Sequence, residues 1–222
     1  MAEDHALGFR TKGQAAYEQL RGWIVHGKLG PGDAVDQERL AESLGVSRMP
    51  LRQALQRLES DGLIERRPHH TAIVTGFSQS DIRDIYAARS VLEGLLAEKG
   101  AGSLDAPGLG RLAAVYDRMS VAVPTADSDV FVRLDWEFHQ VIYRASGYPR
   151  TIDITEQLRS SSERYMYYYA AHSPGTAESL AEHEQIMRAC QEGNPGLARE
   201  LTEKHISRSA AKLITLVGPD DD

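Results

Sequence analysis

The stretch "GVSRMPLRQALQRLESDGLIERR", from Gly45 to Arg67, decides the fold of the first third of this chain. Its glycine follows a short helical pattern, "QERLAESL", and Ser47 is a favourable N-cap for the next helix. Pro50 then falls in the first helical turn, where its missing N–H has no helical partner to lose. The stretch therefore predicts two short helices joined by a tight turn, the second of which ends near "DG" at 61–62.

The flanking segments extend this pattern in both directions. Upstream, "GQAAYEQLRGWIVHGKL" (13–29) predicts another helix, which "GPGD" ends. Downstream, "LIERRP" and "TAIVTGF" are short β-prone segments that predict a hairpin. Two helices, a turn, a third helix and a hairpin are the order of a winged helix-turn-helix. We expect residues 1–78 to form this domain.

The opening stretch is rich in arginine although the chain is acidic. The 222 residues carry 25 Lys+Arg and 32 Asp+Glu, a formal net charge of -7. In a helix-turn-helix the N-terminal end of the second helix enters the major groove, where arginine can reach guanine edges or phosphates. An ordinary solvated helix face is the alternative, and the turn, the cap and the hairpin disfavour it. The candidate DNA-binding residues on this helix are Arg48, Met49, Arg52 and Gln53.

The quoted stretch, together with "YEQLRGWIVHGKLGPGD" upstream, resembles the DNA-binding region of the GntR family of bacterial regulators over residues 12–76. The resemblance implies that Arg48 and Arg52 contact the operator. One departure lies in the wing, where "HHTAIV" has Thr71 in place of the family's usual glycine. His69 and His70 become the candidate wing contacts. Such domains read two half-sites as dimers, so we expect a homodimer on a short palindrome of double-stranded DNA.

From residue 80 onward the pattern becomes helical. Stretches at about 80–102, 107–122, 128–146, 150–171, 176–192 and 195–217 are separated by short breaks that contain proline. Short connections make consecutive helices antiparallel neighbours, so residues 79–222 are predicted to form a bundle of about six helices. The expected fold class is mainly α, a winged helix-turn-helix followed by an antiparallel bundle.

One aspartate and three histidines fall at the same height in this bundle. Asp135 and His139 are four residues apart and share a helix face. His183 and His205 lie about eleven and ten residues from the turn between the last two helices, ~16 Å at ~1.5 Å per residue. Each histidine alone has an ordinary explanation as a surface or core residue. Together they predict a divalent metal site, and Zn²⁺ or Ni²⁺ suits three imidazoles and a carboxylate.

The bundle also resembles a known domain. The segments "DIYAARSVLEGLLAEKGA", "RLDWEFHQVIYRASG" and "EHEQIMRACQEGNPGLARELTEKHI" resemble the effector-binding domain of the FadR branch of GntR regulators, over residues 80–216. The resemblance implies a dimerising, all-helical domain that holds a metal through the four residues above. A departure is "GY" at 147–148, where the family often has "GN".

Four further residues are candidates for binding the effector. Arg89 and Glu93 form an R-x-x-x-E pattern like the family's, in which Arg89 holds a carboxylate; a plain ion pair between them is the alternative. Arg159 lies at the height of the metal layer. Tyr165, in "RYMYYYA", offers a hydroxyl, although core or dimer packing is the favoured explanation of that cluster.

The combined expectation is a metabolite-responsive transcriptional regulator rather than an enzyme. Repression is the family's common mode, with a small carboxylate or sugar acid at the metal centre releasing the operator. A metal-dependent hydrolase is the alternative, since such a site can activate water. The chain has one cysteine, Cys190, no signal-peptide pattern and no apolar run of ~18 residues, so we expect a cytoplasmic protein with no membrane contact. The effector, the operator and the native metal stay open.

Overall fold

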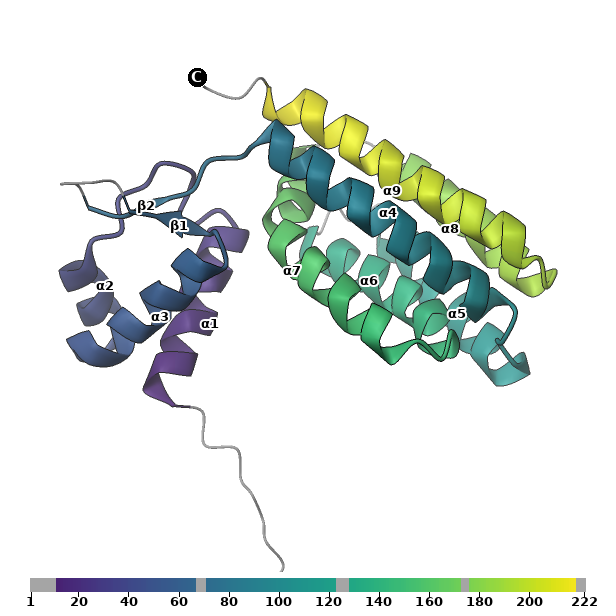
Figure 1. The fold of residues 1–222 in the computed structure, drawn as a ribbon, viewed down its shortest axis with the longest axis horizontal. Helices are drawn as coiled ribbons and strands as arrows, with labels where there is room; N and C mark the ends of the chain where they lie inside the picture. The colour runs from purple at the N-terminus through teal and green to yellow at the C-terminus, as the bar shows by residue number, and fades with distance from the viewer. Residues whose placement is uncertain (1–10, 67–70, 123–127, 173–175, 219–222) are drawn as a thin grey trace, which may run out of the picture. The chain divides into compact units, whose positions relative to one another are not determined.

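The computed structural model describes residues 11–66, 71–122, 128–172 and 176–218 (Figure 1). The chain divides into two compact units, Met1–Gly76 and Phe77–Asp222. The first unit contains α1 (Lys12–Val25), α2 (Gln37–Leu44), α3 (Arg48–Ser60), β1 (Ile64–Glu65) and β2 (Ile73–Val74). The second unit contains α4 (Gln79–Ala101), α5 (Ala106–Ala122), α6 (Ser128–Ala145), α7 (Pro149–His172), α8 (Thr176–Gln191) and α9 (Pro195–Val217). The predicted fold class is confirmed.

Local signals set the helices of the first unit. The Thr11 hydroxyl accepts a hydrogen bond at the start of α1, and the Asp36 carboxylate accepts two at the start of α2. Gly45 ends α2 with a φ of 62°, a left-handed conformation that favours glycine. The expected cap of α3 is wrong in one respect. Ser47 occupies the N-cap position, but its side chain makes no capping hydrogen bond.

A small apolar core joins these helices to the hairpin. Ile64 of β1 pairs with Val74 of β2 in antiparallel register, and Ala34 bridges to Ile73 on the other side. The hairpin therefore gains a third short segment from the chain before α2. The buried apolar residues of this core include Leu20, Leu51, Leu55, Leu58 and Val74. Helix α3 thus turns one face to the core and leaves the other exposed.

The second unit is the expected antiparallel bundle, in which α4 and α9 run side by side (Figure 1). Two glycines of α4 allow its close packing. A Cβ on Gly100 would overlap the backbone carbonyl oxygen of Ile142 in α6, and a Cβ on Gly94 would lie 2.5 Å from the Glu203 side chain in α9. The α6 side chains that carry the site are therefore held against α4.

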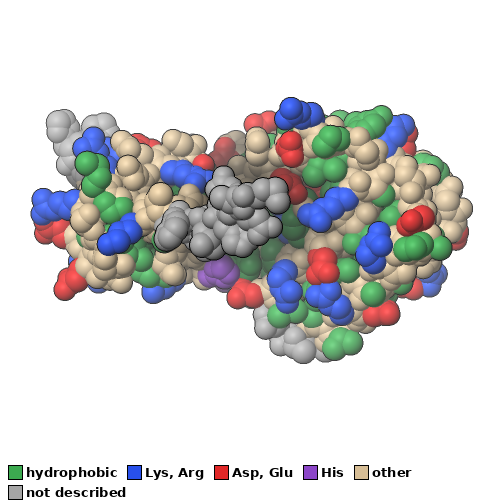
Figure 2. Space-filling view, turned by 90° about the horizontal axis from the view of Figure 1, so that it is seen from below, with side chains coloured by type: hydrophobic (Ala, Val, Ile, Leu, Met, Phe, Trp, Pro, Cys, Tyr) green, Lys and Arg blue, Asp and Glu red, His purple; other side chains and the backbone are tan. Residues whose placement is uncertain are grey.

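The visible surface is chemically mixed. On the face shown in Figure 2, lysine and arginine side chains are interspersed with aspartate and glutamate on both units. Among the described residues, no helix combines the length and the apolarity needed to cross a membrane.

Candidate metal centre and DNA-binding face

Four buried side chains from three helices meet inside the bundle. Asp135 and His139 come from α6, His183 from α8 and His205 from α9. Each offers one ligand atom, and these atoms all lie within 4.8 Å of one another. The predicted meeting of these four residues in one layer is confirmed.

Two of the histidines turn the same ring nitrogen toward the centre. The Nδ1 of His183 lies 2.7 Å from the Ser179 carbonyl oxygen, and the Nδ1 of His205 lies 2.7 Å from Glu182 Oε2. A carbonyl and a carboxylate can only accept, so Nδ1 carries the proton in both rings. The neutral imidazole then presents its Nε2 lone pair inward.

His139 reaches the same state through a longer chain. The Tyr143 hydroxyl donates to Glu93 Oε2 at 2.8 Å, so its oxygen remains to accept from His139 Nδ1 at 3.1 Å. Glu93 is in turn paired with Arg89, whose Nε lies 2.7 Å from Glu93 Oε1. The sequence analysis missed Tyr143, although its spacing of four from His139 was a signal that could have found it.

The centre fits a cation. The Nε2 atoms of His139 and His183 are buried and have no hydrogen-bond partner among the described residues. Asp135 Oδ1 lies 3.2 Å from His183 Nε2 and 4.0 Å from His139 Nε2. With the His183 proton on Nδ1, Nε2 and the carboxylate oxygen face each other as two acceptors. A metal ion between them would satisfy both, so the group could hold one.

The electrostatics keep the ligands in the form that binds metal. Burial lowers the pKa of His139 well below its usual value. Burial also lowers the pKa of His205, against the opposing effect of Glu182. Burial alone would raise the pKa of Asp135, but its surroundings, among them the permanently charged Arg159 guanidinium, hold it well below its usual value. Metal binding needs neutral imidazoles and an ionised carboxylate, and this is the state that the site favours.

Arg159 adjoins the four-residue group. Its Nη1 lies 3.3 Å from Asp135 Oδ2, its Nη2 donates to the Val132 carbonyl at 3.2 Å, and its guanidinium covers the Trp136 ring. The sequence expectation placed Arg159 at this height without its direction, and the structure turns it inward. It is the candidate effector residue in direct contact with the centre.

The other three candidates lie further out. Arg89 and Glu93 are buried behind His139 and form the ion pair that the sequence analysis had left as an alternative. The Tyr165 hydroxyl accepts from the Ser78 amide and from Arg164 Nη2. Tyr165 packs in an apolar cluster separate from the one that surrounds Phe138. The structure thus brings Arg159 to the four residues, places Arg89 and Glu93 one layer away, and leaves Tyr165 apart.

The first unit presents its arginines on α3. Arg52 is exposed and has no hydrogen-bond or ion-pair partner in the part of the chain that the structure describes. Arg48 is also exposed, and its Nη2 lies 2.9 Å from Glu38 Oε1 of α2. Met49 is 69% exposed. These three side chains form an accessible row near the N-terminal end of the helix.

Gln53 differs from its predicted neighbours. Gln53 is exposed like Arg52, but its Oε1 would lie 2.9 Å from a Cβ on Gly13, so the end of this side chain lies beside α1. The row of Arg48 and Arg52 continues, at the same spacing of four, to Gln56, which is also exposed. The candidate wing residues His69 and His70 lie outside the described residues.

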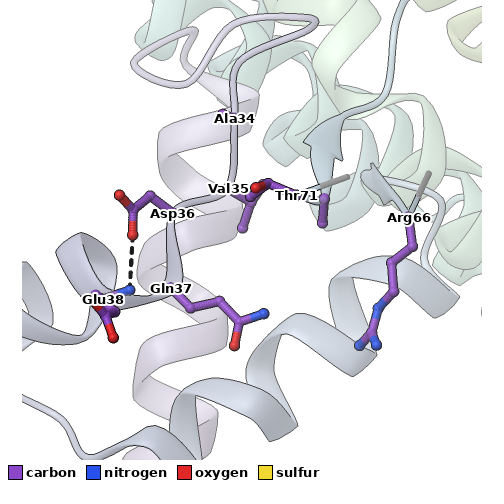
Figure 3. A pocket seen from close by; sticks show the side chains of 8 residues that line it. Ala34, Val35, Asp36, Gln37, Glu38, Arg66 and Thr71 are labelled. Carbon is purple, nitrogen blue, oxygen red and sulfur yellow. Dashed lines mark hydrogen bonds between the residues drawn. The ribbon is translucent and has the colours of Figure 1, made fainter. Parts of the chain in front are cut away.

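A cleft of about 740 Å³ also lies in the first unit, beside the segment 34–38 (Figure 3). The side chains of Gln37 and Arg66 point toward its opening (Figure 3). Asp36 and Glu38 line the same cleft, and this mixed charge favours no single class of ligand. None of the four residues Asp135, His139, His183 and His205 lines this cleft, since they belong to the second unit.

Comparison with protein families matches residues 12–74 to "Bacterial regulatory proteins, gntR family" and residues 84–208 to the FCD domain. The chain belongs to the GntR family of regulators with an FCD domain. Family membership makes it a DNA-binding, metabolite-responsive transcriptional regulator and not an enzyme. The hydrolase alternative is therefore wrong. Two glutamates that adjoin the four residues in sequence pair elsewhere, Glu137 with Arg118 and Glu184 with Arg188.

Individual relatives agree with this assignment. The chain is 27% identical over 200 residues to the transcriptional regulator YdhC of Bacillus subtilis, covering 89% of this chain and 88% of YdhC. It is 25% identical to the transcriptional repressor RspR of Escherichia coli, over 87% of this chain and 85% of RspR. The structure of E. coli McbR/YncC superposes with a TM-score of 0.76 at 22% identity, covering 94% of this chain and 99% of McbR/YncC, which shows a shared fold.

Proposed function

We propose that this regulator is a homodimeric repressor that leaves its operator when a small carboxylate or sugar acid binds at a metal centre. Residues 1–78 bind DNA, and residues 79–222 bind the effector and dimerise. The observation that carries the proposal is the combination, in one chain, of an exposed arginine row on α3 with a buried group of one aspartate and three histidines. The name of the relative RspR supports the repressor mode.

The proposed DNA-binding residues are those of α3 and the wing. Arg48, Met49 and Arg52 are exposed where the recognition helix of this motif meets base edges. Free guanidinium donors can bridge guanine O6 and N7, which supports a role for Arg52 in reading sequence. Gln53 has the weaker claim because it lies against Gly13. The wing contacts proposed are His69 and His70.

The proposed metal ligands are Asp135 and the Nε2 atoms of His139, His183 and His205. This donor set suits zinc or nickel, which would supply a positive centre for ligand oxygens. Arg159 would hold the effector carboxylate beside the ion, since its guanidinium already binds a carboxylate there. Arg89 and Glu93 would act through Tyr143 on His139. Within the described part of the chain the Tyr165 hydroxyl bonds Ser78 and Arg164 rather than the four residues, so its effector role has the weakest support.

A binding-site selection on genomic DNA tests the function. Purified protein is mixed with fragmented DNA from its own source, and the bound fragments are sequenced. We expect enrichment of a short palindrome by wild type and loss of that enrichment in Arg52→Ala. If the protein is a repressor, the palindrome should lie upstream of a gene whose transcript level rises when the regulator is deleted. The protein itself should be found in the cytoplasm. A wild-type protein that enriches no common sequence contradicts the proposal.

A further inference from the structure

Among the described residues, each carboxylate that belongs to the four-residue group or supports one of its histidines has an arginine partner. Asp135 contacts Arg159 directly, with Nη1 and Oδ2 3.3 Å apart. The two outer carboxylates, which hold His139 through Tyr143 and His205 directly, are matched in the same way by the pairs Arg89–Glu93 and Arg208–Glu182. Arg208 also contacts Glu178, which is paired with Lys212, so four negative charges are neutralised by four positive ones.

The histidines do not alter this balance. As metal ligands they are neutral, with Nδ1 protonated and Nε2 free. The surroundings of the centre are therefore electrically neutral before an ion enters, and a divalent ion brings two uncompensated positive charges. All four ligand residues are buried, and Arg159 is only 7% exposed. An uncompensated charge in such an interior is strongly disfavoured.

We propose, on the basis of the metal site in the proposed function, that the ion is bound together with a small oxyanion that carries two negative charges. Oxygens of the dianion complete the coordination shell and cancel the excess charge, whereas a monoanion leaves one positive charge buried. Ion and dianion bind cooperatively, so each raises the affinity for the other. The effector class is narrowed from carboxylates in general to dianions, of which dicarboxylates are the expected members.

Arg159 could affect metal binding through its charge or only by orienting Asp135. If its charge matters, replacing it with a neutral residue leaves the ionised Asp135 uncompensated and makes the empty centre more attractive to a cation. If Arg159 only orients Asp135, its loss weakens metal binding, as removal of an outer partner of a metal ligand commonly does. The two roles predict changes of opposite sign.

The first experiment compares ligands that differ by one charge. Zinc-loaded protein is titrated calorimetrically, at constant ionic strength, with succinate and malonate and with their half-amides succinamate and malonamate. We expect at least one dianion to bind about tenfold or more tightly than its half-amide, and metal-free protein to bind neither comparably. An arm with inorganic phosphate distinguishes a requirement for carboxylates from a requirement for any dianionic oxyanion.

The outcomes distinguish a failure of the charge proposal from a failure of the metal site. If the half-amides bind as tightly as the dianions, or if zinc-loaded protein binds none of these dianions, the charge proposal is overturned while the metal site stands. If the protein binds no zinc, the metal site itself is rejected and the charge proposal with it.

The second experiment uses variants and needs no effector. Zinc affinity is measured by chelator competition in a buffer without polyvalent anions. We expect Arg159→Gln to bind zinc about tenfold more tightly than wild type. Arg159→Lys retains the charge and should show no such gain. Lower zinc affinity in Arg159→Gln, with an unchanged circular dichroism spectrum, overturns the proposal.

Discussion

The exposed arginines of α3 and the buried cluster of α6, α8 and α9 both use charged side chains, in opposite ways. The Arg48–Glu38 pair has side chains that are 87% and 81% exposed, whereas those of the Arg89–Glu93 pair are 2% and 0% exposed. Water already stabilises the first pair, so its members are available to a partner such as DNA. The second pair is shielded from water, so its charges depend on each other and on the hydroxyls of Tyr143 and Ser162, and breaking it should destabilise the bundle.

The largest expected effect comes from breaking the buried pair. Glu93→Ala leaves the Arg89 guanidinium buried without its counterion, which should destabilise the helical unit by about 3–5 kcal/mol. The matched change in the exposed pair, Glu38→Ala, should alter stability by less than about 1 kcal/mol. Urea unfolding measures both changes.

The two tryptophans assign each change to a unit. Trp23 lies in the first unit and Trp136 in the second, so Trp136→Phe and Trp23→Phe backgrounds report the units separately by fluorescence. Equal destabilisation by Glu93→Ala and Glu38→Ala would show that burial does not separate the two pairs.

The DNA-binding side gives the next largest effect. Arg52→Ala should weaken binding to the selected DNA by about 1–3 kcal/mol, because the proposed bidentate contact with a base would be lost. The unfolding midpoint should hardly move, since Arg52 is exposed and unpaired among the described residues. Arg111→Ala removes the same charge from an exposed position on α5 and serves as the control in a fluorescence anisotropy titration. Normal DNA affinity in Arg52→Ala would place the recognition surface elsewhere.

The contrast also explains how much of the site could be predicted from sequence. Helix rise is constant, so counting from the turns was enough to bring His183 and His205 to the height of Asp135 and His139. The partners of these histidines were not predictable in the same way. The orientation of each imidazole ring determines that Ser179 and Glu182 are the partners of His183 and His205. Packing sets this orientation, and sequence spacing does not encode it.

Helix α3 shows that sequence patterns also do not predict every side-chain contact at the surface. The periodicity of α3 identified its core face correctly and placed Gln53 beside Arg52 as a candidate DNA contact. Gln53 is exposed, but its Oε1 also lies close to Gly13 of α1, a tertiary contact that helical periodicity does not encode. Ser47 is a similar case. Its position predicts that its side-chain oxygen caps α3, but the side chain makes no capping hydrogen bond.

A pH titration of the metal-free protein should affect only the buried cluster. The pKa values of His139 and His205 are lowered in the folded state by burial, so the unfolded chain takes up their protons first. Stability is therefore fully present above the unfolded value of about 6.5 and is lost as pH falls below it, by up to about 1.4 kcal/mol per pH unit for each histidine. The lowered pKa of Asp135 extends the loss below about pH 4.

Urea midpoints between pH 8 and 5, in the presence of a chelator, check this prediction for the second unit. His139→Gln should flatten the profile because one of the two titrating rings is gone. A profile for the helical unit that is flat in wild type would mean that these histidines are not kept neutral by the fold.

The smallest expected effect tests the finest detail of the buried cluster, the hydroxyl that orients His139. Tyr143→Phe keeps the ring but removes the oxygen that accepts from His139 Nδ1 and donates to Glu93. Zinc affinity should fall about tenfold, the lower end of the range for losing an outer partner of a metal ligand. Tyr86→Phe is the matched control, because Tyr86 is equally buried but its hydroxyl contacts Met166 instead of a histidine. Chelator competition measures both variants. Unchanged zinc affinity in Tyr143→Phe would show that the ion orients His139 without help, whereas an equal loss in both variants would trace the effect to general packing.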